Sequence, residues 1–223
     1  MCGIIIPMKL FLDTANVDQV QEIAAWGILD GVTTNPSLVL KEGKDFMQTV
    51  LAMCELVPCV SAQVTATDAA GMIKQGEEYA KWHAHVVVKV PVTGSDGEWL
   101  KALTHFSQKG IKTNVTLVFS VNQAILAAKT GATIISPFIG RLDDAGEDGM
   151  ELIAEIMAAW SNYGFATEVL VASTRHPRHI TDAAILGAHI CTIPYDVFKK
   201  LPDHPLSKIG LEKFLSDWKN VAH

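Results

Sequence analysis

Lys89 is the side chain of this sequence that most directly suggests chemistry. It lies in the run 85–92, HVVVKVPV, whose β-branched, apolar composition is typical of a buried strand. Because burial disfavours an ammonium group, a lysine there is expected to have a lowered pKa and to attack a carbonyl as a neutral amine, forming a Schiff base. The alternative is a strand-end lysine whose stem packs while its amine reaches water. This run alone leaves both interpretations open.

Polar side chains also follow most of the other short apolar runs. Asp13 comes directly after the run 9–12 and suits proton transfer or the binding of a hydroxyl; alternatively, it caps the helix that follows Asn16. Thr116 and Gln63 could hold a water molecule for proton shuttling, although the amide of Gln63 cannot itself titrate. The eighth run, which ends in Thr192-Ile193-Pro194, offers little. We therefore expect the chemistry to be shared among the ends of several runs.

Amide and hydroxyl groups at further run ends suit the hydroxyls of a polyol. Asn35 and Asn114 are the amide candidates, although Asn35 precedes Pro36 and could instead close a turn. Thr33 and Ser136 stand at the ends of two more runs.

Arg141 and the segment Ser173-Thr174-Arg175 are the candidates for binding a phosphate. A guanidinium offers several donors in one plane and a serine adds a hydroxyl, but either arginine alone also suits a surface salt bridge. The run 175–179, RHPRH, adds positive charge where a helix is expected to begin, and helix N-termini favour anions. His176 and His179 as zinc ligands would need partners that the sequence does not identify.

The overall composition narrows the classes of function. The 223 residues carry 24 acidic and 18 basic side chains, a net charge of −6, which gives no support to nucleic acid or an anionic membrane as a partner. No run approaches the roughly 20 apolar residues of a membrane span. The four cysteines show no CxxC spacing and indicate a reduced, cytoplasmic setting, with a half metal site at Cys54 and Cys59 as the alternative. Residues 1–7 are expected to be a short N-terminal extension without the basic lead of a signal peptide.

Short apolar runs alternate with longer amphipathic ones along the whole chain. Strands are expected at 9–12, 31–33, 59–64, 86–90, 112–116, 133–136, 168–172 and 189–193. Helices are expected at 17–26, 95–109, 120–130, 148–162, 177–186 and 211–221. Eight such units in this length predict a single (β/α)8 TIM-barrel domain over 1–223, with a C-terminal helical segment at 205–223. A doubly wound open sheet is the main competitor, but there is no GxGxxG turn and no P-loop.

Six ordered motifs give the chain from about residue 8 onward a specific resemblance to the transaldolase family, in particular to its small branch with the fructose-6-phosphate aldolases. They are FLDTA at 11–15, GVTTNPS at 31–37, VKVP at 88–91, TNVTL at 113–117, SPFIGR at 136–141 and ASTR at 172–175. The resemblance implies a class I aldolase barrel that uses neither a metal nor an organic cofactor. It also implies a homo-oligomeric ring, a decamer or a pentamer, in which the C-terminal helix packs on a neighbouring subunit.

The resemblance assigns roles to residues of this chain. Lys89 resembles the Schiff-base nucleophile, Asp13 the proton-transfer residue and Thr116 the residue that holds a catalytic water. Asn35 and Ser136 correspond to ligands of the sugar hydroxyls. The implied phosphate site consists of Arg141, Ser173 and Arg175.

Gln63 is the one departure from the transaldolase pattern. Transaldolases carry a glutamate there and the aldolases carry glutamine, whereas Phe138, Arg175 and the motif Asn114-Val115-Thr116 match transaldolases. We therefore expect a transaldolase that moves a dihydroxyacetone unit between sugar phosphates, with some hydrolytic leakage. The alternatives are a fructose-6-phosphate aldolase that releases free dihydroxyacetone, and a non-catalytic barrel that binds sugar phosphates.

Overall fold

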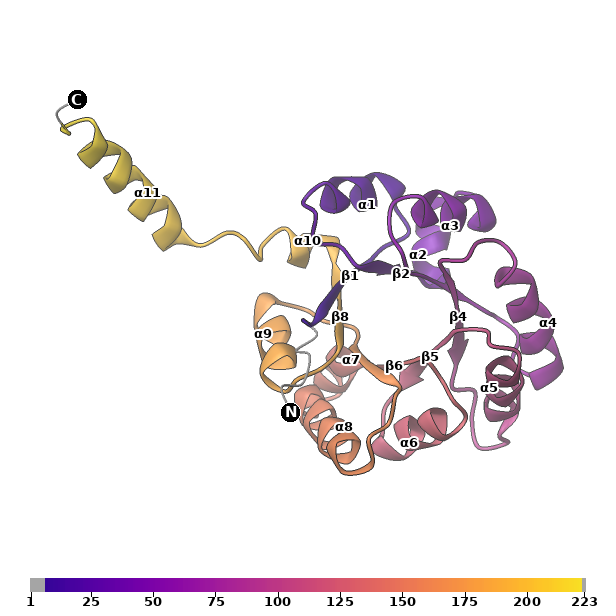
Figure 1. Ribbon diagram of the computed structural model, residues 1–223. Helices are drawn as coiled ribbons and strands as arrows, with labels where there is room; N and C mark the ends of the chain where they lie inside the picture. Colours follow the sequence, from indigo (N-terminus) through magenta and orange to yellow (C-terminus); the bar gives the residue numbers. More distant parts are fainter. Residues whose placement is uncertain (1–6, 222–223) are drawn as a thin grey trace.

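Eight parallel strands close into a barrel in the computed structural model, which describes residues 7–221 (Figure 1). The strands are β1 (Lys9–Asp13), β2 (Gly31–Thr33), β3 (Val60–Gln63), β4 (Val86–Pro91), β5 (Thr113–Val118), β6 (Ile134–Pro137), β7 (Glu168–Val171) and β8 (Ile190–Pro194). Each strand pairs with the next along the chain, and β8 pairs with β1 to complete the ring. The predicted (β/α)8 fold is therefore confirmed, and the open sheet is excluded.

Helices surround the barrel on its outside, except for the terminal helix α11, which extends away from it (Figure 1). They are α1 (Val17–Ala24), α2 (Pro36–Glu42), α3 (Phe46–Cys54), α4 (Ala69–Tyr79), α5 (Glu98–Gln108), α6 (Val121–Lys129), α7 (Ile139–Asp144), α8 (Gly149–Tyr163), α9 (Pro177–Ile185), α10 (Tyr195–Phe198) and α11 (Pro205–Trp218). Apart from the terminal helix, the predicted helices lie within three residues of those observed. The expected extension at 1–7 lies outside the described residues except for Pro7, which is exposed.

Two helix starts differ from the sequence prediction by three residues or more, and five helices were not predicted. The helix expected from residue 95 begins at Glu98, because Gly97 at its N-cap has a φ of +74° that other residues rarely adopt. The helix expected at 211–221 begins six residues earlier, at Pro205, a residue that suits a first helical turn. The sequence did not predict α2, α3, α4, α7 and α10, of which α2, α7 and α10 have seven residues or fewer and too few turns for a clear apolar period.

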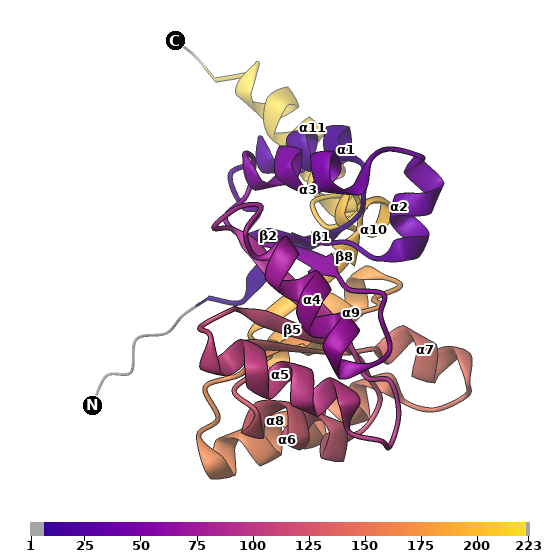
Figure 2. The same ribbon diagram turned by 90° about the vertical axis from the view of Figure 1, so that its right-hand side faces the viewer.

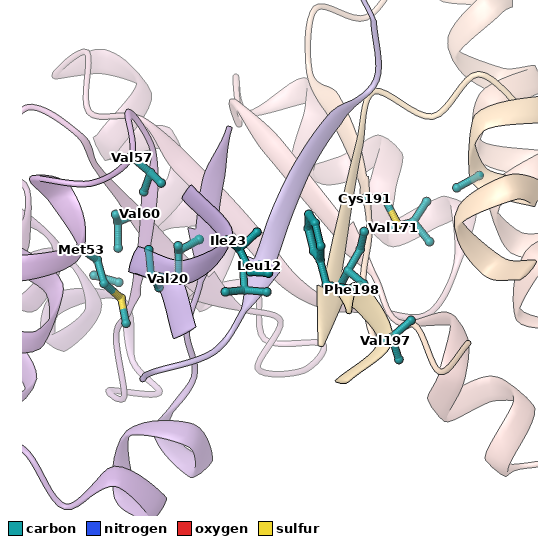
Figure 3. Packing of buried hydrophobic residues seen from close by; sticks show 14 of the residues in the cluster. Leu12, Val20, Ile23, Met53, Val57, Val60, Val171, Cys191, Val197 and Phe198 are labelled. Carbon is teal, nitrogen blue, oxygen red and sulfur yellow. The ribbon is translucent and has the colours of Figure 1, made fainter. Parts of the chain in front are cut away.

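Alternation along the strands produces two apolar layers. Inward-facing residues such as Phe11, Leu170 and Ile190 fill the barrel below the site. Outward-facing residues of the same strands, such as Leu12 and Val171, pack against the helices, as the close-up of one such cluster shows (Figure 3). Filling both sides of the sheet makes the barrel a rigid support for the side chains at its strand ends.

The strand ends open toward one side of the molecule. α2 and α7, which directly follow β2 and β6, both lie on this side, to the right in Figure 2. α11 extends away from the barrel beyond α10, at the upper left of Figure 1, and has no buried residue. Within residues 7–221, no helix is long and apolar enough to cross a membrane.

Candidate active site

A cavity of about 380 Å³ opens at the carboxyl ends of the strands. Nine of the twelve residues expected to act or bind line it: Asp13, Thr33, Asn35, Lys89, Ser136, Phe138, Arg141, Ser173 and Arg175. These residues come from four strands, β1, β2, β4 and β6, from the loops that follow β2, β6 and β7, and from α7. Gln63, Asn114 and Thr116 do not line the cavity.

Lys89 lies at the end of the fourth strand with its side chain inside the barrel. It is 3% exposed, and Nζ donates a hydrogen bond of 2.8 Å to the backbone carbonyl of Thr34. Burial, assisted by the nearby Arg141 guanidinium and opposed by the Asp13 carboxylate, lowers the pKa of Lys89 to about 8. At neutral pH about one amine in ten is then uncharged. The alternative of an amine that reaches bulk water does not hold.

Asp13 shares a hydroxyl chain with two threonines. Thr33 Oγ1 donates a hydrogen bond to Asp13 Oδ1 at 2.8 Å and lies 2.6 Å from Thr192 Oγ1. Because the single proton of the Thr33 hydroxyl is directed at the carboxylate, Thr192 is the donor in the second contact. Burial raises the pKa of Asp13, while the charge of Lys89 and the Thr33 hydrogen bond partly oppose the rise. The opposite shifts bring the pKa values of Asp13 and Lys89 closer together, which lowers the cost of moving a proton at this site.

The capping alternative for Asp13 is excluded, because Asn16 Oδ1 accepts from the backbone N–H groups of Asp18 and Gln19 at the start of α1. The expectation that the eighth strand contributes little was wrong. Thr192 faces inward two residues before the end of β8 and lines the cavity. Strand alternation was the signal that could have identified it.

Asn114 supports the cavity wall from below instead of lining it. Its Oδ1 accepts from Ser136 Oγ at 2.7 Å, and its Nδ2 donates to Ser61 Oγ at 3.1 Å. The residue is fully buried, so in this conformation it positions Ser136. Both the oxygen and the nitrogen of the Asn114 side chain are thus already hydrogen-bonded within the protein, and direct binding of a sugar hydroxyl by Asn114 stays a prediction.

Thr116 is buried two residues further along β5. Within the described chain its Oγ1 has no hydrogen-bond partner, an arrangement that costs about 1–3 kcal/mol unless water supplies the bond. The next residue, Leu117, has a φ of +61°, and the register between β5 and β6 shifts there. Such a bulge re-aims side chains at a strand end.

Gln63 is aligned with Lys89 on the adjacent strand but lines a second cavity, also of about 380 Å³. The walls of this cavity are mostly apolar and include Val39 and Tyr79. Thr34, whose carbonyl receives the Lys89 hydrogen bond, also lines it. Gln63 therefore opens to a different cavity from the one that Lys89 lines.

Helix α2 forms the wall between the two cavities. Asn35 caps it by accepting from the Leu38 N–H at 3.1 Å, which leaves its Nδ2 without a partner among residues 7–221 and available to a ligand. Ser37 and Lys41, one turn apart, face the main cavity and were not expected there. No pattern marked them, because α2 is short and has no buried residue.

The candidate phosphate-binding residues come from α7 and from the loop between β7 and α9. The Arg141 guanidinium lies 5.0 Å from the centre of the Phe138 ring, a cation–π arrangement. Arg175 Nη2 lies 2.7 Å from Asp144 Oδ2, a carboxylate that the sequence did not identify. Ser173 has a φ of +65°, rare for a serine and typical of a strained, closely packed loop.

Positive charge gathers in this cavity although the chain as a whole is acidic. Four cations line it, namely Lys41, Lys89, Arg141 and Arg175, against one carboxylate, that of Asp13. A phosphorylated ligand fits such a balance. In the described part of the chain no three His, Cys, Asp or Glu residues are grouped so as to hold a metal ion.

The basic run 175–179 does not act as one cluster. Arg178 pairs with Asp182 at 2.8 Å on the outside of α9, and His179 is buried, with a pKa lowered mainly by that burial. Only Arg175 of this run lines the cavity. The expected contribution of His179 to the positive charge is therefore wrong, because burial favours the neutral imidazole.

The fold and the cavity define a TIM barrel with a buried lysine among polar strand-end residues. The family model described as "Transaldolase/Fructose-6-phosphate aldolase" matches residues 10–223, and the chain belongs to this family. The expected family resemblance is thereby confirmed.

Similar proteins match this chain over nearly the whole length of both sequences. A protein of Methanococcus vannielii named "Probable transaldolase" is 57% identical over 212 residues, which cover 95% of this chain and 97% of that protein. Proteins of the same name from Brevibacillus brevis and Alkaliphilus metalliredigens are 53% and 52% identical, and each match covers 96% of this chain and at least 99% of the relative. Membership and similarity together indicate an enzyme of transaldolase type.

Proposed function

We propose that this protein is a transaldolase that works through a Schiff base on Lys89. The donor is a ketose phosphate, fructose 6-phosphate or sedoheptulose 7-phosphate. The acceptor is an aldose phosphate, erythrose 4-phosphate or glyceraldehyde 3-phosphate. The observation that carries the proposal is the buried amine with a pKa of about 8 in a cavity that also holds Asp13 and the two arginines.

The proposed reaction begins with attack of the Lys89 amine on the C2 carbonyl of the donor. Loss of water from the carbinolamine gives the iminium ion, and proton removal from the C4 hydroxyl breaks the C3–C4 bond. Asp13 is suited to these proton transfers because of its raised pKa and its Thr33 contact. The unpartnered hydroxyl of Thr116 is suited to hold the water that is released and taken up.

Arg141, Ser173 and Arg175 are proposed to bind the phosphate, and Asn35 and Ser136 the sugar hydroxyls. The enamine that remains on Lys89 then attacks the acceptor aldehyde. Phe138, which lines the cavity under Arg141, has no hydroxyl with which to steady a water molecule near the enamine. This favours transfer over hydrolysis. The names of the relatives support the same choice.

A fructose-6-phosphate aldolase is the second candidate, favoured by one residue. Gln63 cannot exchange a proton, so the shuttle that completes transfer is weaker than with a carboxylate at this position. Both candidates form the same enamine and differ in its fate. A non-catalytic sugar-phosphate-binding barrel is the third.

Two measurements separate these candidates. Borohydride reduction in the presence of fructose 6-phosphate is expected to attach the sugar to Lys89, and absence of the adduct would exclude both enzymes. Release of glyceraldehyde 3-phosphate is then followed with and without erythrose 4-phosphate. We expect release to depend on the acceptor, and acceptor-independent release would favour the aldolase.

We further propose that the chain forms a homo-oligomer through α11. This helix exposes apolar side chains along its whole length, with Leu206 67%, Ile209 60% and Phe214 70% exposed. Apolar area of this kind on a helix that extends from the barrel is suited to pack on a second copy. The number of subunits and the cytoplasmic location stay predictions.

A further inference from the structure

His179 holds the backbone of the loop that carries Ser173 and Arg175. It lies in the first turn of α9 and is 7% exposed. Its Nδ1 accepts a hydrogen bond of 3.2 Å from the Arg175 N–H, so Nδ1 carries no proton. In the neutral ring the proton is therefore on Nε2, and Asp143 Oδ2 lies 3.4 Å from that nitrogen.

Asp143 is itself held in place. Its Oδ1 accepts from the backbone N–H of Gly149 at 2.9 Å. The adjacent Asp144 contacts the Arg175 guanidinium at 2.7 Å. The two successive carboxylates at the end of α7 thus act on the same residue, Asp144 at the side chain of Arg175 and Asp143, through His179, at its backbone.

The loop leaves little freedom for another arrangement. A side-chain carbon at Gly140 would lie 2.1 Å from the Ser173 carbonyl oxygen and 2.9 Å from Arg175 Nε, so the loop packs directly on the backbone of α7. With Ser173 at a φ of +65°, this conformation is one that its neighbours must impose.

We propose that His179 is a positioning residue for phosphate binding, which orients the loop 173–175 toward the phosphate of the substrate through its Nδ1 and is itself oriented by Asp143. The inference rests on the proposed function for the identity of the ligand as a sugar phosphate. His179 lines no part of the cavity and acts only through Arg175.

Protonation of His179 removes the acceptor that the loop needs. Burial, the charge of His176, whose ring centre is 3.8 Å away, and that of Arg175 all lower the pKa of His179, while Asp143 and Asp182 raise it. Burial dominates, so the neutral ring is present at neutral pH. As the pH falls through this pKa, Nδ1 gains a proton that faces the Arg175 N–H, and the loop loses its support.

The first test compares a phosphorylated and an unphosphorylated sugar. Borohydride trapping is measured at pH 7.5 against the concentration of fructose 6-phosphate or of D-fructose. For His179→Leu we expect the half-saturating concentration of fructose 6-phosphate to rise about tenfold, which is the effect of weakening a charge-assisted phosphate contact. The half-saturating concentration of D-fructose should stay within about twofold of the wild-type value. His179→Asn, whose Oδ1 takes the place of Nδ1, is expected to restore most of the affinity.

His189→Leu is the matched control. His189 also accepts a backbone N–H at Nδ1, from Val169 at 3.1 Å, and its pKa is also lowered by burial, but it precedes β8 at the far end of the barrel. In this variant, the ratio of the half-saturating concentrations of fructose 6-phosphate and D-fructose is expected to equal that of wild type. Equal losses for both sugars in His179→Leu, or the same change in His189→Leu, would overturn the inference.

The second test uses pH. Wild-type affinity for fructose 6-phosphate should fall on acidification more steeply than that of His179→Asn, which cannot titrate, and D-fructose should show no such difference. Asp143→Asn removes a charge that raises the pKa of His179, so it should move the fall to lower pH. Parallel profiles for wild type and both variants would contradict the proposal.

Binding of inorganic phosphate, followed by calorimetry, separates this inference from the proposed function. The dissociation constant is expected to be about tenfold weaker in His179→Leu than in wild type. An unchanged constant would overturn the role of His179, whatever the trapping shows. Weaker phosphate binding together with no wild-type adduct would uphold the role of His179 and reject the Schiff-base proposal.

Discussion

Lys89 and Thr34 are joined by a 2.8 Å hydrogen bond from the side-chain nitrogen to a backbone carbonyl. The carbonyl can accept from an amine as well as from an ammonium group, so it fixes the position of the nitrogen without requiring the charged form. A carboxylate in direct contact would have stabilised the ammonium and raised its pKa. The geometry therefore holds the nucleophile in place while burial brings its pKa to about 8.

Lys89→Met is expected to abolish the borohydride adduct while the barrel stays folded, because methionine has a similar length and suits an apolar site. Mass spectrometry of the reduced protein with fructose 6-phosphate measures the adduct. Lys112→Met, at the other end of the barrel, is the control and should still be labelled. Turnover by Lys89→Met would show that the nucleophile is another residue.

The same variant is also expected to be more stable than wild type at pH 7. Between its folded pKa of about 8 and its unfolded value of 10.5, Lys89 binds a proton only when unfolded, so the free energy of unfolding rises with pH in this window. Below pH 8 the buried charge costs about 3 kcal/mol, which an uncharged methionine side chain would not incur. Thermal unfolding should show an advantage at pH 7 that disappears above pH 10.5; a constant difference would contradict the pKa assignment.

The rate of Schiff-base formation is expected to rise with pH to a midpoint near 8, as the Lys89 amine loses its proton. Asp13 opposes the lowered pKa of Lys89, so Asp13→Asn should shift this midpoint to lower pH while reducing turnover at least about tenfold through loss of proton transfer. Trapping rates between pH 6 and 10 measure both effects. A midpoint that stays in place would mean that the Asp13 charge does not reach the amine.

Gln63→Glu is expected to raise the rate of transfer to erythrose 4-phosphate relative to the release of free dihydroxyacetone. A carboxylate next to the Lys89 strand restores a group that can exchange protons. Gln75→Glu adds the same charge at a residue that lines neither cavity, and it should leave the ratio unchanged. An equal or lower transfer rate in Gln63→Glu would show that this residue does not determine the outcome.

Thr192→Val is expected to reduce kcat by about five- to tenfold and to lower the free energy of unfolding by about 1 kcal/mol. The reason is that the Thr33 hydroxyl loses its hydrogen bond with Thr192 and keeps only the one to Asp13. The half-saturating concentration of substrate should change little, since the phosphate-binding residues are untouched. Thr49→Val, a buried threonine on α3 that bonds only the Asp45 carbonyl, is the matched control for stability. Equal kcat values for wild type and Thr192→Val would exclude a role for this hydroxyl.

Phe214→Asp is expected to reduce the size of the assembly, because it places a charge on the exposed apolar surface of α11. Light scattering after gel filtration gives the mass of wild type and variant. Tyr163→Asp, a similarly exposed aromatic on α8, should leave that mass unchanged. A wild-type protein that is already monomeric would contradict the oligomer proposal.

The sequence determined the barrel and the chemical types at its strand ends. Alternation of apolar runs with amphipathic segments specifies strands and helices through short-range periods, and eight such units leave few other ways to bury so much apolar surface. Residues such as Lys89 and Asp13 stand out because a charged group inside or directly after a buried run is unexpected. The sequence did not predict α2, because this helix is short and has no buried residue to give an apolar period.

Only the tertiary structure decided which of these groups meet and in what state. Closure of the ring brings Thr192 of β8 to Thr33 of β2, which are 159 residues apart, and places Gln63 on a different cavity from Asp13. It also buries His179 in neutral form under Arg175, where the sequence had indicated a positive charge. The reason is physical: the type of a side chain sets what it can do, whereas its pKa and partners depend on desolvation and contacts that exist only once distant strands are packed together.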